Sequence, residues 1–320
     1  MEILDTSSKQ CKILVKDGKK YVIRYPRKIG ATIEYYRSTP ESEILKIIEK
    51  SDIKVPKVLY KGEKYSVQEY IEGDLLSEKY EDHKQIDRDI IDQTIEQIYL
   101  LSDIDGEKLM QYANWNDNRS FYEFQCTNTE KVLEKYYRSL NQLYDGLNLS
   151  PSIIQYLKSK SDSINNERNM SIIHGDRHKK NAIINSSDEL VFIDWELGCL
   201  GDIAYDIAFH LHQMAYTEED EKYFLDKLKD RFNEDSESLL NDVELYRLFL
   251  LARSALYHVY WTDLVYKTGS KEEIEKQLGH FMRRYNKLSK FKEFNIQPKS
   301  EEQLSKVFEG FRNSSIEDQR

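Results

Sequence analysis

The hydrophobic pattern of this 320-residue chain changes once along its length, close to Gly73. Before that residue, apolar and polar side chains alternate in short runs, which is typical of strands. After it, apolar residues recur at helical spacing, as in the series of isoleucines from Ile86 to Ile98. The change indicates an α+β chain with two lobes. Residues 1–72 are expected to form a small lobe around a mixed β-sheet, and residues 73–320 a large, mainly helical lobe.

The small lobe is expected to hold four strands and one helix. The strands are the extended runs Cys11–Val15, Lys20–Tyr25, Lys57–Tyr60 and Tyr65–Ile71. Asp17 and Gly18 separate the first two runs, and an Asp-Gly pair in that position is a strong hairpin signal. Pro40 precedes the run from Glu41 to Ile48, where it suits the start of a helix.

In the large lobe, two short strands are expected among helices. Ala182–Ile184 and Leu190–Ile193 are apolar runs joined by turn-forming residues. From Tyr205 to about Leu288 the pattern is helical again. The charged stretch from Gln297 onward is expected to fray.

Composition limits the partners and the compartment. The chain carries 47 basic and 57 acidic residues, a formal net charge of −10, which disfavours binding to nucleic acid or to an anionic membrane. Its three cysteines, Cys11, Cys126 and Cys199, show no paired spacing, which argues for a reducing compartment and against disulfides or a zinc site. The first residues do not follow the pattern of a signal peptide, and no segment is apolar enough to span a bilayer. We therefore expect a cytoplasmic protein, monomeric by default, without nucleic-acid or membrane partners.

The strongest chemical signal is a short motif in the large lobe. His174, Gly175 and Asp176 are followed at the right distance by Asn181, which matches the His-x-Asp-x-x-x-x-Asn order of the catalytic loop of protein kinases. Such a loop presents a carboxylate to the acceptor hydroxyl and an amide oxygen to a metal ion. Asp194 follows directly after an apolar strand, where a carboxylate can bind the Mg²⁺ that bridges nucleotide phosphates. The order of these residues favours phosphoryl transfer.

Two residues of the small lobe suit the same reaction. Arg24, on the second strand of the hairpin, stands where kinases place a lysine that pairs with phosphates, and arginine keeps the charge. Glu41, at the start of the helix, is its expected ion-pair partner, with Glu43 as an alternative. A solvated Arg24 and an acidic helix start favoured by the dipole would explain the same residues without any function.

Together these motifs resemble the aminoglycoside phosphotransferase and choline kinase family, which are small-molecule kinases of the protein-kinase-like fold. The resemblance rests on His174–Asn181, on the Ile-Asp-Trp-Glu run 193–196 and on the Gly-Asp-Ile-Ala-Tyr-Asp run 201–206. It implies a bilobal fold with Asp176 as catalytic base. It also implies that Asn181 and Asp194 hold magnesium, and that His174 and Asp206 support the catalytic loop.

The nucleotide site follows from the same resemblance. The donor is expected to be ATP or GTP, bound through backbone groups near Glu69 and Ile71 in the segment that joins the lobes. The phosphate loop is expected between the first strands, in the glycine-free stretch that contains Ser7 and Ser8. Without glycine the backbone approaches phosphates less easily, so hydroxyl and amide groups of these serines are the expected donors.

The resemblance leaves the acceptor open. A cationic or hydroxylated molecule such as an aminoglycoside-like antibiotic is expected, and choline, ethanolamine or a sugar is the alternative. Candidate acceptor residues are Glu196 and an aromatic and acidic cluster, Tyr257, Tyr260, Trp261 and Asp263, which could hold a cation on ring faces. Aromatic residues at helical spacing are more often core packing. A catalytically silent nucleotide-binding pseudokinase remains a further alternative.

Overall fold

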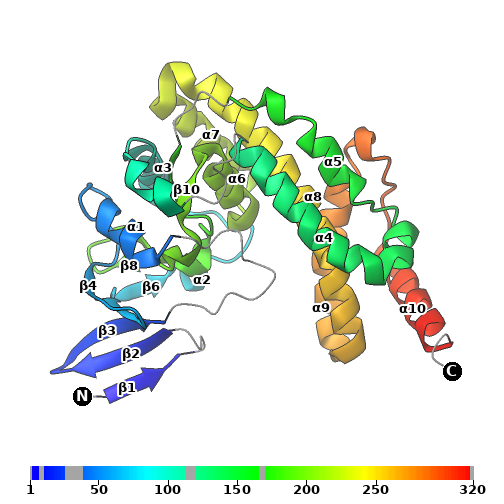
Figure 1. The fold of residues 1–320 in the computed structure, drawn as a ribbon, viewed down its shortest axis with the longest axis horizontal. Helices are drawn as coiled ribbons and strands as arrows, with labels where there is room; N and C mark the ends of the chain where they lie inside the picture. The colour runs from blue at the N-terminus through cyan, green and yellow to red at the C-terminus, as the bar shows by residue number, and fades with distance from the viewer. Residues whose placement is uncertain (1, 7–10, 26–38, 113–119, 166–169, 318–320) are drawn as a thin grey trace. The chain divides into compact units, whose positions relative to one another are not determined.

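The computed structural model describes residues 2–6, 11–25, 39–112, 120–165 and 170–317 (Figure 1). The chain forms two compact units, each made of two stretches of sequence. Unit 1 comprises Met1–Asn118 and Asn165–Tyr246, and unit 2 comprises Arg119–Ile164 and Arg247–Arg320. The lobe boundary between residues 72 and 73 stays a prediction.

Unit 1 begins with a five-stranded sheet in the order β1-β2-β3-β5-β4. The strands are β1 (Glu2–Asp5), β2 (Cys11–Lys16), β3 (Lys19–Arg24), β4 (Val58–Lys61) and β5 (Ser66–Glu69). The hairpin between β2 and β3 is confirmed, with Asp17 and Gly18 at φ values of 52° and 74° in its turn. All four pairings are antiparallel, so the expectation of a mixed sheet is wrong. Strand β1 was not expected from the sequence.

The predicted helix of the small lobe is present as α1 (Glu41–Ile48), with Pro40 at its N-cap. Its apolar side chains Ile44, Leu45 and Ile48 are fully buried. Glu41 therefore stands at the first turn of a helix fixed by packing.

Two smaller sheets in unit 1 carry the motif residues. One has the order β6-β8-β9, from β6 (Gly73–Leu75), β8 (Ala182–Asn185) and β9 (Leu190–Phe192), and the other pairs β7 (Ser171–Ile173) with β10 (Cys199–Gly201). Gly73 has a φ of +156°, and a Cβ there would lie 2.1 Å from the carbonyl oxygen of Ile184. Only glycine allows the chain to enter this sheet so closely.

Helices surround these sheets in unit 1. They are α2 (Leu76–Lys79), α3 (Arg88–Ser102), α6 (Ile203–Met214) and α7 (Glu218–Phe232), with short 3-10 turns at Glu107–Tyr112, Lys179–Asn181, Trp195–Leu197 and Asn233–Asp235. Of the series of isoleucines seen in the sequence, Ile90, Ile91, Ile95 and Ile98 are buried in α3, and Ile86 is buried just before it. This confirms the helix predicted there.

Unit 2 is helical in the part that the structure describes. It contains α4 (Phe121–Gly146), α5 (Ser152–Lys158), most of α8 (Ser236–Thr268), α9 (Lys271–Leu288) and α10 (Glu301–Glu317), with 3-10 turns at Ser161–Ser163 and Lys292–Phe294. Helix α10 corrects the expectation that the chain frays after Gln297. Its Leu304 and Phe308 are buried, and Phe308 stacks on Tyr266 with ring centroids 5.3 Å apart. Two apolar residues one turn apart anchor the segment despite its charged composition.

None of the described helices combines the length and the apolar character that crossing a bilayer requires.

Candidate active site

The His-Gly-Asp motif lies in a loop that begins where β7 ends and closes with the 3-10 turn Lys179–Asn181. Gly175 takes a φ of +75°, and a Cβ at this residue would lie 2.5 Å from the carbonyl oxygen of Leu197. A side chain would therefore meet backbone, which explains why glycine occupies the second position of the motif. We call residues 174–181 the catalytic loop.

His174 is a fully buried link at the start of this loop. Its Nδ1 accepts the backbone N–H of Asp176 at 3.2 Å, and its Nε2 donates to the carbonyl of Ile193 at 3.0 Å. An N–H can only donate and a carbonyl can only accept, so these two bonds fix the ring hydrogen on Nε2. Burial, reinforced by the charge of Arg177, lowers the pKa of His174 to about 4. The ring is neutral and joins the loop to the segment before Asp194.

Asp206 stabilises the loop through hydrogen bonds to its carboxylate. Its carboxylate accepts the backbone N–H groups of His174 at 3.2 Å and Gly175 at 2.9 Å, and Nε of Arg177 at 3.2 Å. The local topology explains this placement, because β10 pairs with β7 and delivers the start of α6 next to the loop. The structure thus brings together the two residues that the resemblance named as supports, His174 and Asp206.

Arg177 completes this support and was not singled out in the sequence. Its side chain is fully buried, and its guanidinium lies over the ring of Phe192, 4.3 Å from the centroid. Burial lowers the pKa of Arg177, although the carboxylate of Asp206 opposes this. Removing either member of this buried ion pair should destabilise the fold, because the remaining charge would be buried without a partner.

Asp176 lies in the same loop with about a third of its side chain exposed (30 %). Asn181 Nδ2 donates to Oδ2 of this carboxylate at 3.1 Å and to its backbone carbonyl at 3.0 Å. Nε2 of His178 lies 3.5 Å from the same Oδ2. Burial would raise the pKa of Asp176, but the contact with His178, together with His174 and Asn181, holds it below its usual value. The carboxylate is therefore ionised at neutral pH and can accept a hydrogen bond from a hydroxyl.

Asp194 is presented by an unusual backbone conformation at the end of β9. It takes a left-handed φ of 62°, which is uncommon for a residue other than glycine and needs support from its neighbours. Next to it, Trp195 is fully buried, and its indole N–H donates to the carbonyl of Phe192 at 2.9 Å. This packing turns the Asp194 side chain, which is 34 % exposed, toward β3.

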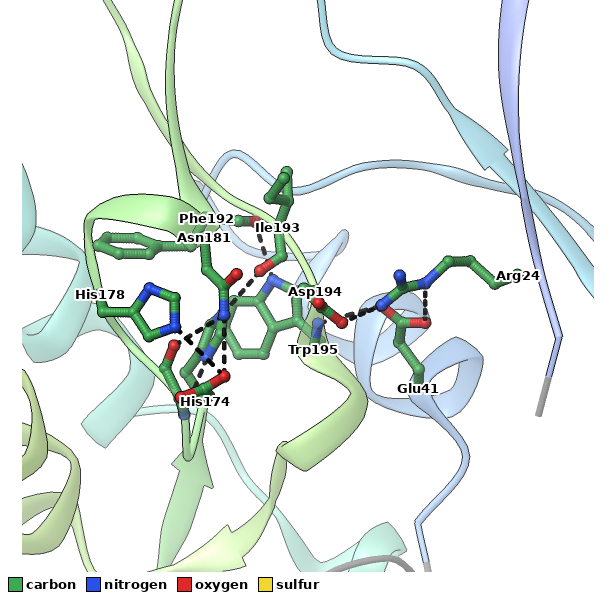
Figure 2. Close-up of polar contacts among 10 residues, drawn as sticks. Arg24, Glu41, His174, His178, Asn181, Phe192, Ile193, Asp194 and Trp195 are labelled. Atoms are coloured by element: carbon green, nitrogen blue, oxygen red, sulfur yellow. Dashed lines mark hydrogen bonds and ion pairs between the residues drawn. The ribbon is translucent and has the colours of Figure 1, made fainter. Parts of the chain in front are cut away.

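Arg24, Glu41 and Asp194 form an ion-pair group across three elements, as Figure 2 shows. Arg24 Nε donates to Glu41 Oε2 at 3.1 Å, and its Nη2 donates to Glu41 Oε1 at 3.3 Å and to Asp194 Oδ1. Burial opposes the charge of Arg24, but the two carboxylates outweigh it and raise the pKa of Arg24. Glu41 also accepts the backbone N–H of Trp195 at 3.0 Å. The expected partner of Arg24 is therefore present, while Glu43 pairs with Lys61 instead.

The donor set suits magnesium only in company with a nucleotide. In the described part of the chain, no three His, Cys, Asp or Glu side chains gather so that they could hold a metal alone. Mg²⁺ prefers oxygen ligands and commonly takes one or two from protein and the rest from phosphates and water. Asp194 supplies a carboxylate. Asn181 uses its Nδ2 group for the hydrogen bonds to Asp176, and its amide oxygen is the group that would bind the metal. These two residues fit a magnesium ion that a nucleotide brings with it.

The expected nucleotide residues are partly described. Glu69 ends β5, and its backbone N–H donates to the carbonyl of Lys57 at 2.9 Å, while Ile71 lies in the connection between β5 and β6. Ser7 and Ser8 lie outside the described residues. The connection that contains them joins β1 to β2, whose last pair is Asp5 with Lys12.

The expected acceptor residues fall in different units. Glu196 belongs to unit 1, in the 3-10 turn that follows Asp194, whereas the others lie on α8 in unit 2. There the rings of Tyr257 and Tyr260 contact the ring of Tyr136 of α4, with centroid separations of 6.2 Å and 4.2 Å respectively. Trp261, 49 % exposed, lies beside Tyr260, with 5.3 Å between the ring centroids.

Asp263 is buried in unit 2 and pairs with Lys267 at 2.7 Å, so a cation there would compete with this lysine. Sequence reasoning missed Tyr136, because α4 carries no motif that links it to α8.

Comparisons with known proteins show which family and which fold the chain matches. The model of the phosphotransferase enzyme family matches residues 5–240. Among solved structures, the chain resembles an ethanolamine kinase from Plasmodium vivax, with a TM-score of 0.59, 16 % identity and coverage of 88 % of this chain and 81 % of that one. It resembles the ADP-bound aminoglycoside phosphotransferase APH(2'')-Ib at a TM-score of 0.57 and 16 % identity, over 89 % of this chain and 93 % of that one.

Two further likenesses concern proteins named LicA. The choline kinase LicA from Streptococcus pneumoniae gives a TM-score of 0.54 at 16 % identity, over 91 % of this chain and 94 % of that one. The curated "Protein LicA homolog" of Metamycoplasma hominis is 30 % identical over 118 residues, which are 37 % of this chain. The match spans only 45 % of the length of that relative. The structural likenesses establish the protein-kinase-like fold, and since the family model covers most of the sequence, this chain belongs to the phosphotransferase enzyme family.

Proposed function

We propose that this protein transfers the γ-phosphoryl group of ATP or GTP to a hydroxyl group of a small molecule that also carries a positive charge. One observation carries the proposal. Asp176 and Asn181 are joined by a hydrogen bond within one loop. Asp194 forms an ion pair with Arg24, which is 170 residues away in the sequence. A general base, two oxygen ligands for a metal and a phosphate-binding cation are the parts that phosphoryl transfer requires.

Each residue has a role that follows from its surroundings. Asp176 accepts the hydrogen of the acceptor hydroxyl and orients its oxygen toward the γ-phosphorus. The new oxygen–phosphorus bond forms as the bond to the β-phosphate oxygen breaks, and the hydroxyl proton passes to Asp176 or to solvent. Asn181 and Asp194 would hold Mg²⁺, which neutralises charge on the phosphates when bound. Arg24 adds a second positive charge with a two-pronged donor geometry.

The acceptor is inferred from shared chemistry. The solved structures that the chain resembles include kinases named for ethanolamine, choline and aminoglycosides. These molecules all combine a hydroxyl with a positively charged nitrogen. The net charge of −10 favours attraction of such a cation. Glu196 is the acceptor-binding carboxylate that we propose, because it lies two residues after Asp194. A neutral sugar remains the alternative.

The test measures the release of ADP or GDP from ATP or GTP in the presence of magnesium, with and without an acceptor. The acceptors are an aminoglycoside, choline, ethanolamine and a neutral sugar. Tetramethylammonium serves as a matched control, because it carries the charge of choline without the hydroxyl. Turnover with a cationic alcohol, absent with tetramethylammonium and lost in Asp176→Asn, would support the proposal.

Other results would point elsewhere. Turnover with the sugar alone would replace the cationic acceptor by a neutral one. Magnesium-dependent nucleotide binding without turnover on any acceptor would favour the silent pseudokinase. If no nucleotide binds, the proposed function is wrong.

A further inference from the structure

We propose that His178 is a positioning residue that holds the carboxylate of Asp176 through its Nε2–H group, in a tautomer set by the backbone of Lys180. The inference rests on the proposed function, because it concerns the aspartate that we assign as base. It adds a residue to the site that the kinase motif leaves unspecified.

The tautomer of His178 follows from one hydrogen bond. His178 is the N-cap of the 3-10 turn and has an extended backbone conformation. Its Nδ1 accepts a hydrogen bond from the backbone N–H of Lys180 at 3.1 Å. A backbone N–H can only donate, so Nδ1 carries a lone pair and the hydrogen of the neutral ring lies on Nε2. The same arrangement occurs at His174, whose Nδ1 accepts the N–H of Asp176 two residues on. Both rings are therefore oriented by the loop itself.

The two rings differ in what their Nε2–H groups face. That of His174 is buried and donates to a backbone carbonyl, whereas that of His178 faces the carboxylate of Asp176 at 3.5 Å. Both His178, at 23 %, and Asp176, at 30 %, are partly exposed, so they lie where an acceptor can reach them. A separation of 3.5 Å is at the outer limit of a hydrogen bond, and such contacts in catalytic sites commonly tighten when substrate binds.

The position of this contact on the carboxylate matters. His178 approaches Oδ2, the same oxygen that accepts Asn181 Nδ2. Asn181 already donates to Oδ2, and a His178 contact that tightens to a second hydrogen bond on this oxygen would fix the rotation of the carboxylate and leave Oδ1 for the acceptor hydroxyl. Within the described residues, no lysine or arginine pairs with Asp176: Lys179 pairs with Asp82, and Arg177 pairs with Asp206. Asn181 is also a proposed metal ligand. His178 has no such second role, so we assign it to orienting the base.

Substitutions can separate this role from the local turn. In asparagine, Oδ1 is attached to Cγ as Nδ1 is in histidine, so His178→Asn keeps an acceptor for Lys180 N–H but loses the donor near Asp176. In glutamine, Nε2 is as many bonds from Cα as Nε2 of histidine, so His178→Gln keeps that donor but loses the acceptor. A capping role predicts that asparagine is tolerated and glutamine is harmful. A positioning role predicts the reverse.

The first experiment measures kcat, KM for both substrates and thermal stability of these two variants. We expect His178→Asn to lower kcat by about tenfold to a hundredfold, the range for a misplaced catalytic group, with KM and melting temperature close to wild type. His178→Gln should recover most of kcat. The proposal is overturned if His178→Asn keeps full kcat, or if both folded variants lose kcat equally.

The second experiment needs no acceptor, so it separates this proposal from the proposed function. With ¹⁵N-labelled histidine, ring correlations in NMR should show His178 with its hydrogen on Nε2. Asp176→Asn should move the Nε2 resonance of His178 and change that of His174 much less. A His178 ring protonated on Nδ1, or one that does not respond to Asp176→Asn, would overturn the proposal even if the wild type turns over. An inactive wild type with the expected spectra would count against the proposed function alone.

Discussion

The catalytic loop and the ion-pair group Arg24–Glu41–Asp194 are built in opposite ways. In the loop, Asp206 accepts the backbone N–H groups of His174 and Gly175, and His174, Arg177 and Asp206 are fully buried. The ion-pair group joins three charged side chains from distant segments, all of them partly exposed. One region is fixed by burial, and the other is held by charges that can exchange partners.

This difference matches what each region has to do. A base must be aligned with the acceptor before reaction, and buried hydrogen bonds provide that alignment without rearrangement. A phosphate-binding group must instead accept and release a charged nucleotide in every cycle. The pairing of Arg24 with Asp194 shows two groups that satisfy each other in the protein alone. The comparison predicts different responses to mutation in the two regions.

The largest effect is expected from Asp176→Asn. The substitution keeps the shape of the side chain and one acceptor oxygen but replaces the other oxygen by an amide group and removes the base, so turnover should fall roughly 10²- to 10⁴-fold. Nucleotide affinity and melting temperature should stay close to wild type, because the buried supports of the loop are untouched. Steady-state kinetics and calorimetric nucleotide binding check this. Undiminished turnover would remove Asp176 from the mechanism.

Asp206→Ala tests the buried support directly. It deprives two backbone N–H groups and Arg177 of their acceptor and leaves a buried cation unpaired, so the free energy of unfolding should fall by about 3–5 kcal/mol. Urea denaturation measures the change. The matched control is Asp226→Ala, which breaks a surface pair with Lys222 and should cost at most about 1 kcal/mol. Equal losses in the two variants would mean that burial does not stabilise the loop.

Acid should weaken the same region through His174. Its pKa in the fold is about 4, below the value of about 6.5 in an unfolded chain, so the unfolded state binds more protons between these values. The contribution of the neutral ring is complete above about pH 6.5 and is lost as the pH falls toward 4, by about 3 kcal/mol at most. The measurement is the free energy of unfolding against pH for wild type and His174→Gln. The difference between them should shrink as the pH falls, and a constant difference would contradict a neutral buried ring.

The sequence predicted the parts of the site that lie in short motifs. Asp176, Asn181 and Asp194 stand in one loop and after one strand, so their order and spacing indicate their neighbourhood. Arg177 could not be recognised in this way, because its partner Asp206 lies 29 residues further along and meets it only after β10 has paired with β7. His178 did carry a usable signal. It precedes Lys180 by the same spacing by which His174 precedes Asp176.

The fold shows the same limit. The hairpin and α1 had local signals, Asp17 with Gly18 and Pro40, and both are present. Strand β1 had none, because its four residues are all exposed and show no burial pattern. The contact between α4 and α8 depends on tertiary packing alone, which is why Tyr136 escaped notice. Helix α10 was hidden by its charged composition, although two buried apolar residues hold it.

The smallest effect is expected from Arg24→Lys, which changes the exchangeable region without removing its charge. Lysine has no fork, so it cannot bond Glu41 through two nitrogens while reaching Asp194, and nucleotide affinity should fall by about tenfold. Stability should fall less than in Asp206→Ala, since lysine keeps a positive charge beside the two carboxylates. Calorimetric titration with nucleotide and magnesium, set beside urea denaturation, gives both values. If Arg24→Lys instead destabilised the fold as much as Asp206→Ala while binding nucleotide normally, Arg24 would be a structural residue like Arg177, and the contrast between the two regions would not hold.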